Sequence, residues 1–237
     1  MNNLVQLCQL EDSLVVHNFI PLKYLLGILK DSSIKFKRIS LWEDVYENYA
    51  FKEKYQLNDG TIVSVADKMQ NRLYGQCWTD ADESDAMWRI YSHFERNNEN
   101  LAVRVSTTIG KMKEALKEQN YDIRRVIYKK QSQIEQFPPL YVYGLEKFFR
   151  DSSFVKRNEF NHEKEIRVVI ENDTEKVNLL PIQVPFDFFD KYMLDPRLTD
   201  EQEGSIKNSL TSRGALSEKI HKSKLYEFNV KTIQILN

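Results

Sequence analysis

The segment NHEKEIRVVI, residues 161–170, carries the strand signal that decides the fold class of this chain. Within it the β-branched residues Ile166, Val168 and Ile170 recur at every second position. Alternation of this kind over four to eight residues is the main sequence signature of a β-strand. We therefore predict a strand from Glu165 to Ile170.

The other face of this strand carries an unusual run of charges. If the strand starts early, Glu163, Glu165 and Arg167 lie on one face, because side chains two residues apart on a strand point the same way. Two carboxylates about 6.7 Å apart repel by roughly 2.4 kcal/mol at an effective dielectric constant of about 20. That repulsion raises one carboxyl pKa unless Arg167 compensates it. The pattern predicts either an ion-paired sheet face or a functional carboxylate pair, and both alternatives stay open.

Working outward from this segment, strand and helix patterns mix along the chain without strict alternation. Further strands are predicted at 13–20, 33–39, 74–79, 100–106, 121–129, 177–184 and 224–236. Helices are predicted at 22–33, in the second half of 41–55, and at 61–74, 84–94, 107–119, 140–151 and 200–210. This order predicts the α+β class: a single domain over residues 1–237, with its core at about 14–227. Its central sheet is expected to be mixed, largely antiparallel and flanked by helices, with 74–79, 100–106 and 165–170 at its centre.

Composition excludes several classes of protein. Lysine and arginine number 34 against 35 acidic residues, and this balance argues against general nucleic-acid binding, which needs a basic excess. Only 7 glycines occur, and no glycine-rich phosphate loop is present. The two cysteines form neither a disulfide framework nor a CxxC metal site. No signal peptide and no apolar run of membrane-spanning length are found, so we expect a cytoplasmic protein.

Two polar residues, Thr79 and His17, are candidates for a catalytic or ligand-binding role. Thr79 ends a short apolar strand and precedes an acidic segment, residues 80–85. That segment fits a strand-to-helix turn, or Thr79 could present its hydroxyl to a cleft. His17 lies within the apolar run LVVHNFI and is either a hydrogen-bonded core residue or a group that orients a ligand hydroxyl. The acidic segment lacks EF-hand spacing, so we assign no metal site.

Motifs spread over residues 14–227 resemble the bacterial domain-of-unknown-function family 2971. The matching positions are Asp44 and Glu47; Cys77, Trp78 and Thr79; Met87, Trp88 and Tyr91; and Glu163, Glu165 and Arg167. The combination of M-W-x-x-Y with E-x-E-x-R is the most specific part of the resemblance. Thr79 stands where the family usually has serine. The family name carries no activity, so function has to be argued from the site.

The layout of these motifs is also similar to that of the ADP-ribosyltransferase fold. The similarity implies that Glu165 is the catalytic carboxylate, with Glu163 positioning the acceptor and Thr79 supporting the nicotinamide side. It implies further that NAD is bound by His17, Trp88, Tyr91 and Arg167. A fixed carboxylate suits this chemistry, because cleavage between nicotinamide and ribose builds positive charge on the sugar. The resemblance would make the protein a toxin or an antiphage effector that binds a nucleotide-like small molecule and modifies an unidentified acceptor.

Two alternatives remain open at the level of sequence. One is a metal-dependent nuclease that uses the carboxylates of Asp44, Glu47, Glu163 and Glu165. The other is a non-catalytic interaction or sensor module whose acidic face only forms ion pairs.

Overall fold

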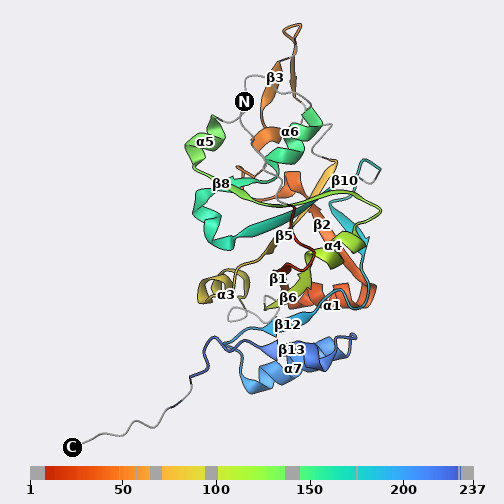
Figure 1. Cartoon of the computed structure of the whole chain (residues 1–237), viewed down its shortest axis with the longest axis vertical. Coiled ribbons are helices and arrows are strands. Elements are labelled where there is room, and N and C mark those ends of the chain that lie inside the picture. The colour runs from red at the N-terminus through yellow and green to blue at the C-terminus, as the bar shows by residue number, and fades with distance from the viewer. Residues whose placement is uncertain are drawn as a thin grey trace, which may run out of the picture. The chain divides into compact units, whose positions relative to one another are not determined.

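The structure is a computed structural model of the whole chain (Figure 1). It describes residues 9–47, 49–56, 58–64, 71–93, 101–136, 145–174, 176–228 and 230. The described elements mix helices with a largely antiparallel sheet, so the predicted α+β class is confirmed. No helix in the described ranges is long and apolar enough to cross a membrane.

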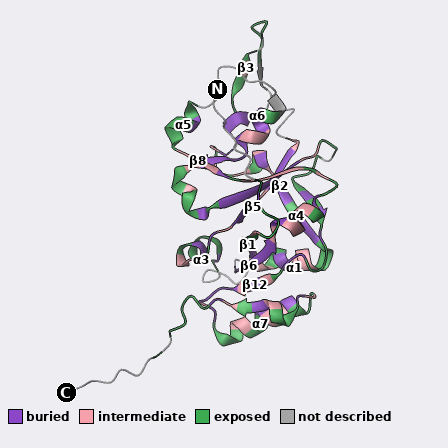
Figure 2. Ribbon diagram, viewed as in Figure 1, coloured by how far each residue is buried: buried purple, intermediate pink, exposed green. Residues whose placement is uncertain are grey.

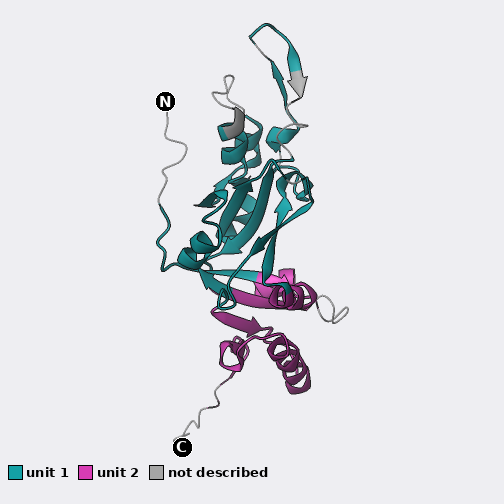
Figure 3. Cartoon of the chain, turned by 90° about the vertical axis from the view of Figure 1, so that its right-hand side faces the viewer, with its two compact units in different colours: residues 1–18, 31–81, 106–189 teal, residues 19–30, 82–105, 190–237 magenta. Residues whose placement is uncertain are grey.

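Contacts between residues divide the chain into two compact units, coloured separately in Figure 3. Unit 1 comprises residues 1–18, 31–81 and 106–189, and unit 2 comprises residues 19–30, 82–105 and 190–237. Each unit is built from three separate stretches of sequence. The expectation of one domain over residues 1–237 stays a prediction.

The sheet of unit 1 is organised around strand β5 (Leu73–Thr79). Its strand order is β11 (Leu179–Gln183), β2 (Ser33–Arg38), β5, β1 (Val15–Pro21) and β6 (Ala102–Thr108). Strand β10 (Glu165–Glu171) lies off this path and pairs with both β5 and β7 (Asn120–Arg125). Strand β5 pairs with β10 along its whole length, with β2 at Tyr74 and Gly75, and with β1 at Thr79. The end of β5 at Thr79 therefore lies between β1 and β10.

Strand β10 confirms the prediction made for residues 165–170. Six of its seven residues are buried, and they point alternately to both faces of the sheet. In Figure 2 the strands around the β2 and β5 labels are coloured mostly as buried. Ile166, Val168 and Ile170 pair with Trp78, Gln76 and Tyr74 of β5. The apolar alternation thus fills one side of the strand, and the charged residues Glu165 and Arg167 are buried on the other side.

Short segments and several helices complete unit 1. These are η1 (Ile39–Leu41), η2 (Tyr49–Phe51), β3 (Lys54–Gln56), β4 (Ile62–Ser64), α4 (Ile109–Ala115), β8 (Ile127–Lys129), α5 (Gln131–Glu135), α6 (Leu145–Ser152), β9 (Val155–Arg157) and η4 (Asn158–Glu163). Aromatic side chains dominate the core beside them: Phe51 and Phe149 stack with ring centroids 5.0 Å apart. Strands β8 and β9 form a separate parallel pair.

Gly75 is required in β5 because the indole ring of Trp42 packs directly on it. A Cβ atom at this position would lie 2.5 Å from Cζ2 of Trp42. Since packed interiors leave little room for such an atom, we expect Gly75→Ala to lower the free energy of unfolding by about 1–3 kcal/mol. Urea unfolding measures this loss. Gly27→Ala is the control: nothing lies within 4 Å of the added Cβ, and a helical Gly→Ala change should be neutral or stabilising.

Unit 2 has its own sheet segment and core. Its elements are α1 (Leu22–Asp31), α3 (Asp85–Tyr91), β12 (Lys191–Leu194), α7 (Asp200–Thr211), η5 (Ser217–Lys219) and β13 (Ile220–Lys222), and the strand order in this unit is β6, β12, β13. Strands β12 and β13 pair in parallel. Phe19, Met87, Trp88 and Ala102 form a buried cluster with Met193 packed against it.

Three predictions of secondary structure are wrong where the structure describes the residues. In the predicted helix at 61–74, residues 62–64 instead form strand β4, because they pair with β3. Residues 65–70 of that prediction lie outside the described residues. The second half of 41–55 forms a 3-10 turn and β3 instead of a helix. In the predicted closing strand, residues 224–228 are turn and coil, and 229 and 231–237 lie outside the described residues. Strands β12 and β13 were not predicted, because they are four and three residues long and show little alternation.

Candidate functional site

Three of the predicted site residues lie in a row across neighbouring strands of unit 1. Thr79 of β5 pairs with His17 of β1 on one side and with Glu165 of β10 on the other. Residues directly opposite each other in antiparallel strands present their side chains on the same face. The sheet register therefore brings together an imidazole, a hydroxyl and a carboxylate that are far apart in the sequence.

The Glu165 carboxylate is buried and held by two cations. Its Oε1 accepts a hydrogen bond from Arg167 Nε at 2.5 Å, and its Oε2 lies 3.0 Å from Lys156 Nζ. The residue is 3% exposed. Burial by itself raises the pKa of this carboxyl, but Arg167 and then Lys156 outweigh burial and lower the pKa to about 2. Glu165 is therefore ionised at neutral pH.

Arg167 is the anchor of the cluster. Its guanidinium donates from Nη1 to the backbone oxygen of Ser153 at 2.7 Å and from Nη2 to Glu47 Oε1 at 2.7 Å, and it lies 4.6 Å from the ring centroid of Trp42. The residue is 0% exposed. Burial lowers the pKa of this group, but Glu165 and Glu47 raise it above its ordinary value. Arg167 thus fixes the Glu165 carboxylate, and its assignment to ligand binding stays a prediction.

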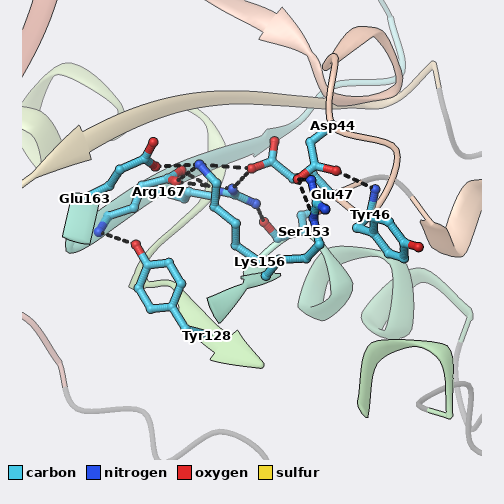
Figure 4. Close-up of polar contacts among 10 residues, drawn as sticks. Asp44, Tyr46, Glu47, Tyr128, Ser153, Lys156, Glu163 and Arg167 are labelled. Atoms are coloured by element: carbon cyan, nitrogen blue, oxygen red, sulfur yellow. Dashed lines mark hydrogen bonds and ion pairs between the residues drawn. The ribbon is translucent and has the colours of Figure 1, made fainter. Parts of the chain in front are cut away.

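Lys156 of β9 joins three carboxylates, and Figure 4 labels it together with two of these residues, Glu47 and Glu163. Its Nζ lies 2.5 Å from Glu163 Oε2, 3.0 Å from Glu165 Oε2 and 3.2 Å from Glu47 Oε1. Burial lowers the pKa of the ammonium, but the surrounding carboxylates raise it well above its ordinary value. We call the five residues Glu47, Lys156, Glu163, Glu165 and Arg167 the charge cluster.

Glu163 reaches the charge cluster by a route that the strand pattern did not predict. Strand β10 begins at Glu165, so Glu163 ends the 3-10 helix η4 instead of extending the strand. Lys164 between them adopts a left-handed backbone with φ 42°, which turns the chain. The backbone oxygen of Glu163 accepts a hydrogen bond from Thr79 Oγ1 at 2.5 Å, and its side chain meets Lys156. The two predicted carboxylates therefore share a cation, although they do not share a strand.

Cys77 of β5 lies beside the charge cluster. Cys77 is exposed and pairs with Arg167 across β5 and β10. Even so, burial raises the pKa of its thiol well above the ordinary value, and Glu165 raises it further.

Tyr128 of β8 is a further polar residue in contact with Glu165. Its Oη accepts a hydrogen bond from the Glu165 amide at 2.8 Å, and burial raises the pKa of the Tyr128 hydroxyl to about 12.

The remaining predicted binding residues have structural partners. His17 is half-buried, and its Nδ1 lies 2.8 Å from Ser106 Oγ. Trp88 belongs to the core of unit 2, where its Nε1 donates to Glu83 Oε2 at 3.0 Å. Tyr91 stacks on Phe19 with ring centroids 5.4 Å apart. A role for Trp88 and Tyr91 in ligand binding stays a prediction.

The acidic residues predicted as an alternative metal site are engaged in ion pairs. Asp44 accepts from Arg157 at 3.2 Å, and Glu47 belongs to the charge cluster. Within the described ranges, no group of three or more His, Cys, Asp or Glu side chains could hold a metal ion. The nuclease alternative has no geometric support in these residues.

The sequence patterns missed Lys156 and Tyr128 as members of the site. Lys156 follows Phe154 and Val155, and nothing local distinguishes it from a lysine at a sheet edge. Tyr128 was included only as part of a predicted strand, 121–129. Both residues meet Glu165 through tertiary contacts, so a single sequence contains no signal for them.

Comparison with known proteins assigns neither a family nor an activity. No family model matches the chain, so membership of family 2971 is not confirmed, and no curated protein matches it. Similar solved structures include DarT from Thermus sp. 2.9 in complex with NAD+, with a TM-score of 0.43, 9% identity, and coverage of 90% of this chain and 97% of that chain. The complex of the same protein with ADP-ribosylated ssDNA has a TM-score of 0.43 and 9% identity, and the match covers 90% of this chain and 96% of that chain. Its complex with carba-NAD+ has a TM-score of 0.40 and 8% identity, and the match covers 91% of this chain and 98% of that chain. At TM-scores this low, the likeness does not decide the fold family or the function of this chain.

Proposed function

We propose that this protein cleaves the bond between nicotinamide and ribose in NAD+, as an ADP-ribosyltransferase or an NAD glycohydrolase. The observation that supports the proposal most directly is the row of His17, Thr79 and Glu165 across three adjacent strands. In the reaction the bond to C1′ breaks and nicotinamide leaves with the bonding electrons. A nucleophile, either water or an acceptor group, then bonds to C1′ and loses its proton to solvent.

The electrostatics of Glu165 suit the charge that develops in this reaction. Positive charge builds on the ribose as nicotinamide leaves, and a carboxylate fixed beside it stabilises the transition state. Glu165 is ionised at neutral pH, because its pKa is about 2. Arg167 holds the carboxylate in one position through Oε1, so little reorganisation is needed at the moment of reaction.

The neighbouring groups have roles within the same proposal. Contact with Ser106 orients the His17 imidazole, which can serve as a hydrogen-bonding group for a ribose hydroxyl. Thr79 lies between His17 and Glu165 in the sheet, where it supports the nicotinamide side. Glu163 lies within reach of Lys156 beside Glu165, where it can position an acceptor.

One observation favours a second candidate, a non-catalytic interaction or sensor module. Both oxygens of Glu165 are already paired with cations, and the side chain is almost fully buried. Under this alternative the charge cluster only organises unit 1 and never meets a substrate. Activity measurements separate the two candidates.

Nicotinamide release from NAD+ tests the proposal. We expect the wild-type chain to release nicotinamide and Glu165→Gln to release it about 100-fold more slowly, the effect typical of removing one transition-state-stabilising group. Glu159→Gln is the matched control, because Glu159 is an exposed glutamate on η4 and should leave the rate unchanged. Thermal unfolding of each variant checks that the fold persists at the assay temperature.

Two results would contradict the proposal. One is equal release by the wild type and by folded Glu165→Gln, which would remove Glu165 from the mechanism. The other is no release by the wild type combined with no shift of its melting temperature by NAD+. That second result would favour the non-catalytic alternative.

A further inference from the structure

The charge cluster contains an excess of one formal negative charge. Three carboxylates, from Glu47, Glu163 and Glu165, surround the two cations of Lys156 and Arg167. Buried charges are tolerated when they are paired and hydrogen-bonded, so each cation matters to the cluster. The two cations, however, are held in different ways.

Arg167 is a permanent member of the cluster. It lies on the same strand as Glu165, and its guanidinium is fixed by Glu165, Glu47 and the backbone oxygen of Ser153. A planar guanidinium with several fixed donors loses many contacts at once if it moves. Arg167 also contacts both oxygens of Glu165, since Nη2 lies 3.3 Å from Oε2. Glu165 is therefore held in place without the help of Lys156.

Lys156 is held in the charge cluster mainly by the electrostatic interactions of its ammonium group. Its ammonium contacts the three carboxylates and the ring of Phe160, whose centroid lies 4.7 Å from Nζ. Its side chain is 11% exposed, whereas that of Arg167 is 0% exposed. It extends on a flexible stem from β9, a three-residue strand outside the main sheet. A change of rotamer can move the ammonium away from Glu165 without disturbing the main sheet.

We propose that Lys156 is a displaceable counterion: at rest its ammonium covers Oε2 of Glu165, and a cationic group of the ligand replaces it when the site is occupied. The proposal rests on the function proposed above, and it adds that Lys156 blocks access of the ligand to Glu165 in the resting protein. The nicotinamide ring of NAD+ is a pyridinium cation, and the ribose becomes cationic as the bond breaks. Either charge competes with Lys156 for the same carboxylate oxygen. Displacement of Lys156 is then the step that opens the site.

Substituting the lysine tests this role. Lys156→Met keeps the approximate length of the side chain and removes its charge, whereas Lys156→Arg keeps a positive charge. Lys147→Met is the surface control, because Lys147 is exposed and pairs with Asp151 outside the charge cluster. We expect Lys156→Met to raise kcat/KM for nicotinamide release about tenfold or more, since competent minor states are commonly populated at or below about 10%. Lys147→Met should stay near the wild-type value, whereas Lys156→Arg, which keeps a positive charge beside Glu165, should show no gain in kcat/KM.

A binding measurement makes the test independent of catalysis. Calorimetric titration with 1-methylnicotinamide, a pyridinium cation without a ribose, should show about tenfold tighter binding by Lys156→Met than by the wild type. Neutral nicotinamide should show no such gain. Equal affinity of the wild type and folded Lys156→Met for the cation overturns the proposal. A gain in cation affinity without nicotinamide release from any chain leaves the counterion role standing and overturns the proposed function.

Lys156→Met removes a cation from beside three carboxylates and can therefore impair folding. The double variant Lys156→Met with Glu47→Gln restores the formal charge of the cluster to −1, and the amide oxygen introduced by the second change can still accept from Arg167. The same gains in kcat/KM and in cation affinity are expected for this double variant. Wild-type values in the folded double variant overturn the proposal as clearly as in the single one.

Discussion

Arg167→Leu is expected to lower the free energy of unfolding by about 3–5 kcal/mol, the typical loss when one partner of a buried ion pair is removed. Arg167 is fully buried, and its removal leaves Glu165 and Glu47 without their main cation and the Ser153 oxygen without its donor. Urea unfolding followed by circular dichroism measures the change. The stability of a typical domain is about 5–15 kcal/mol, so this variant is expected near the limit of folding.

Arg157→Leu is the matched control for this prediction. Its guanidinium pairs with Asp44 at 3.2 Å and packs over the ring of Tyr46, but its side chain is 28% exposed. A partly exposed pair contributes about 1 kcal/mol or less. Losses of similar size in Arg157→Leu and Arg167→Leu would mean that Arg167 is not the anchor of the charge cluster.

Acid is expected to destabilise the protein by about 3 kcal/mol through Glu165 alone, because a difference of about 2.5 pKa units corresponds to that free energy. The pKa of Glu165 is about 2 in the folded chain, against an ordinary value of 4.5. A carboxyl whose folded pKa is depressed binds its proton more readily in the unfolded state, so stability falls as pH falls. The contribution is complete above the ordinary pKa of 4.5 and is lost as the pH falls to about 2.

Urea unfolding at several pH values, from about neutral down to about the folded pKa of Glu165, measures this dependence. The Glu165→Gln variant provides the comparison, because it lacks the titrating group at the same position. Its stability should fall less steeply than that of the wild type over this pH range. Identical slopes for the two chains would show that Glu165 titrates with an ordinary pKa and is not held by Arg167 and Lys156.

Local sequence patterns were sufficient for those parts of the fold that depend on neighbours along the chain. The alternation of Ile166, Val168 and Ile170 predicted β10, and the same period placed Glu165 and Arg167 on one face. A helix was predicted from residue 84, and Ser84 caps α3 there, because its Oγ accepts a hydrogen bond from the Met87 amide. Where partner strands decide the structure, the patterns failed: residues 62–64 form β4 because β3 pairs with them.

By itself, the sequence determined the α+β class, the strand at 165–170 and the identity of Glu165, Thr79 and His17 as residues of interest. Only the tertiary structure decided that these three form a row, because the register of β1, β5 and β10 joins residues that are far apart along the chain. It also decided that Glu47 and Lys156 complete the charge cluster, and that the turn at Lys164 brings Glu163 to the cluster from η4. The physical reason is that side-chain periodicity is a local property of the backbone, whereas a buried charge finds its partners through the packing of the whole unit.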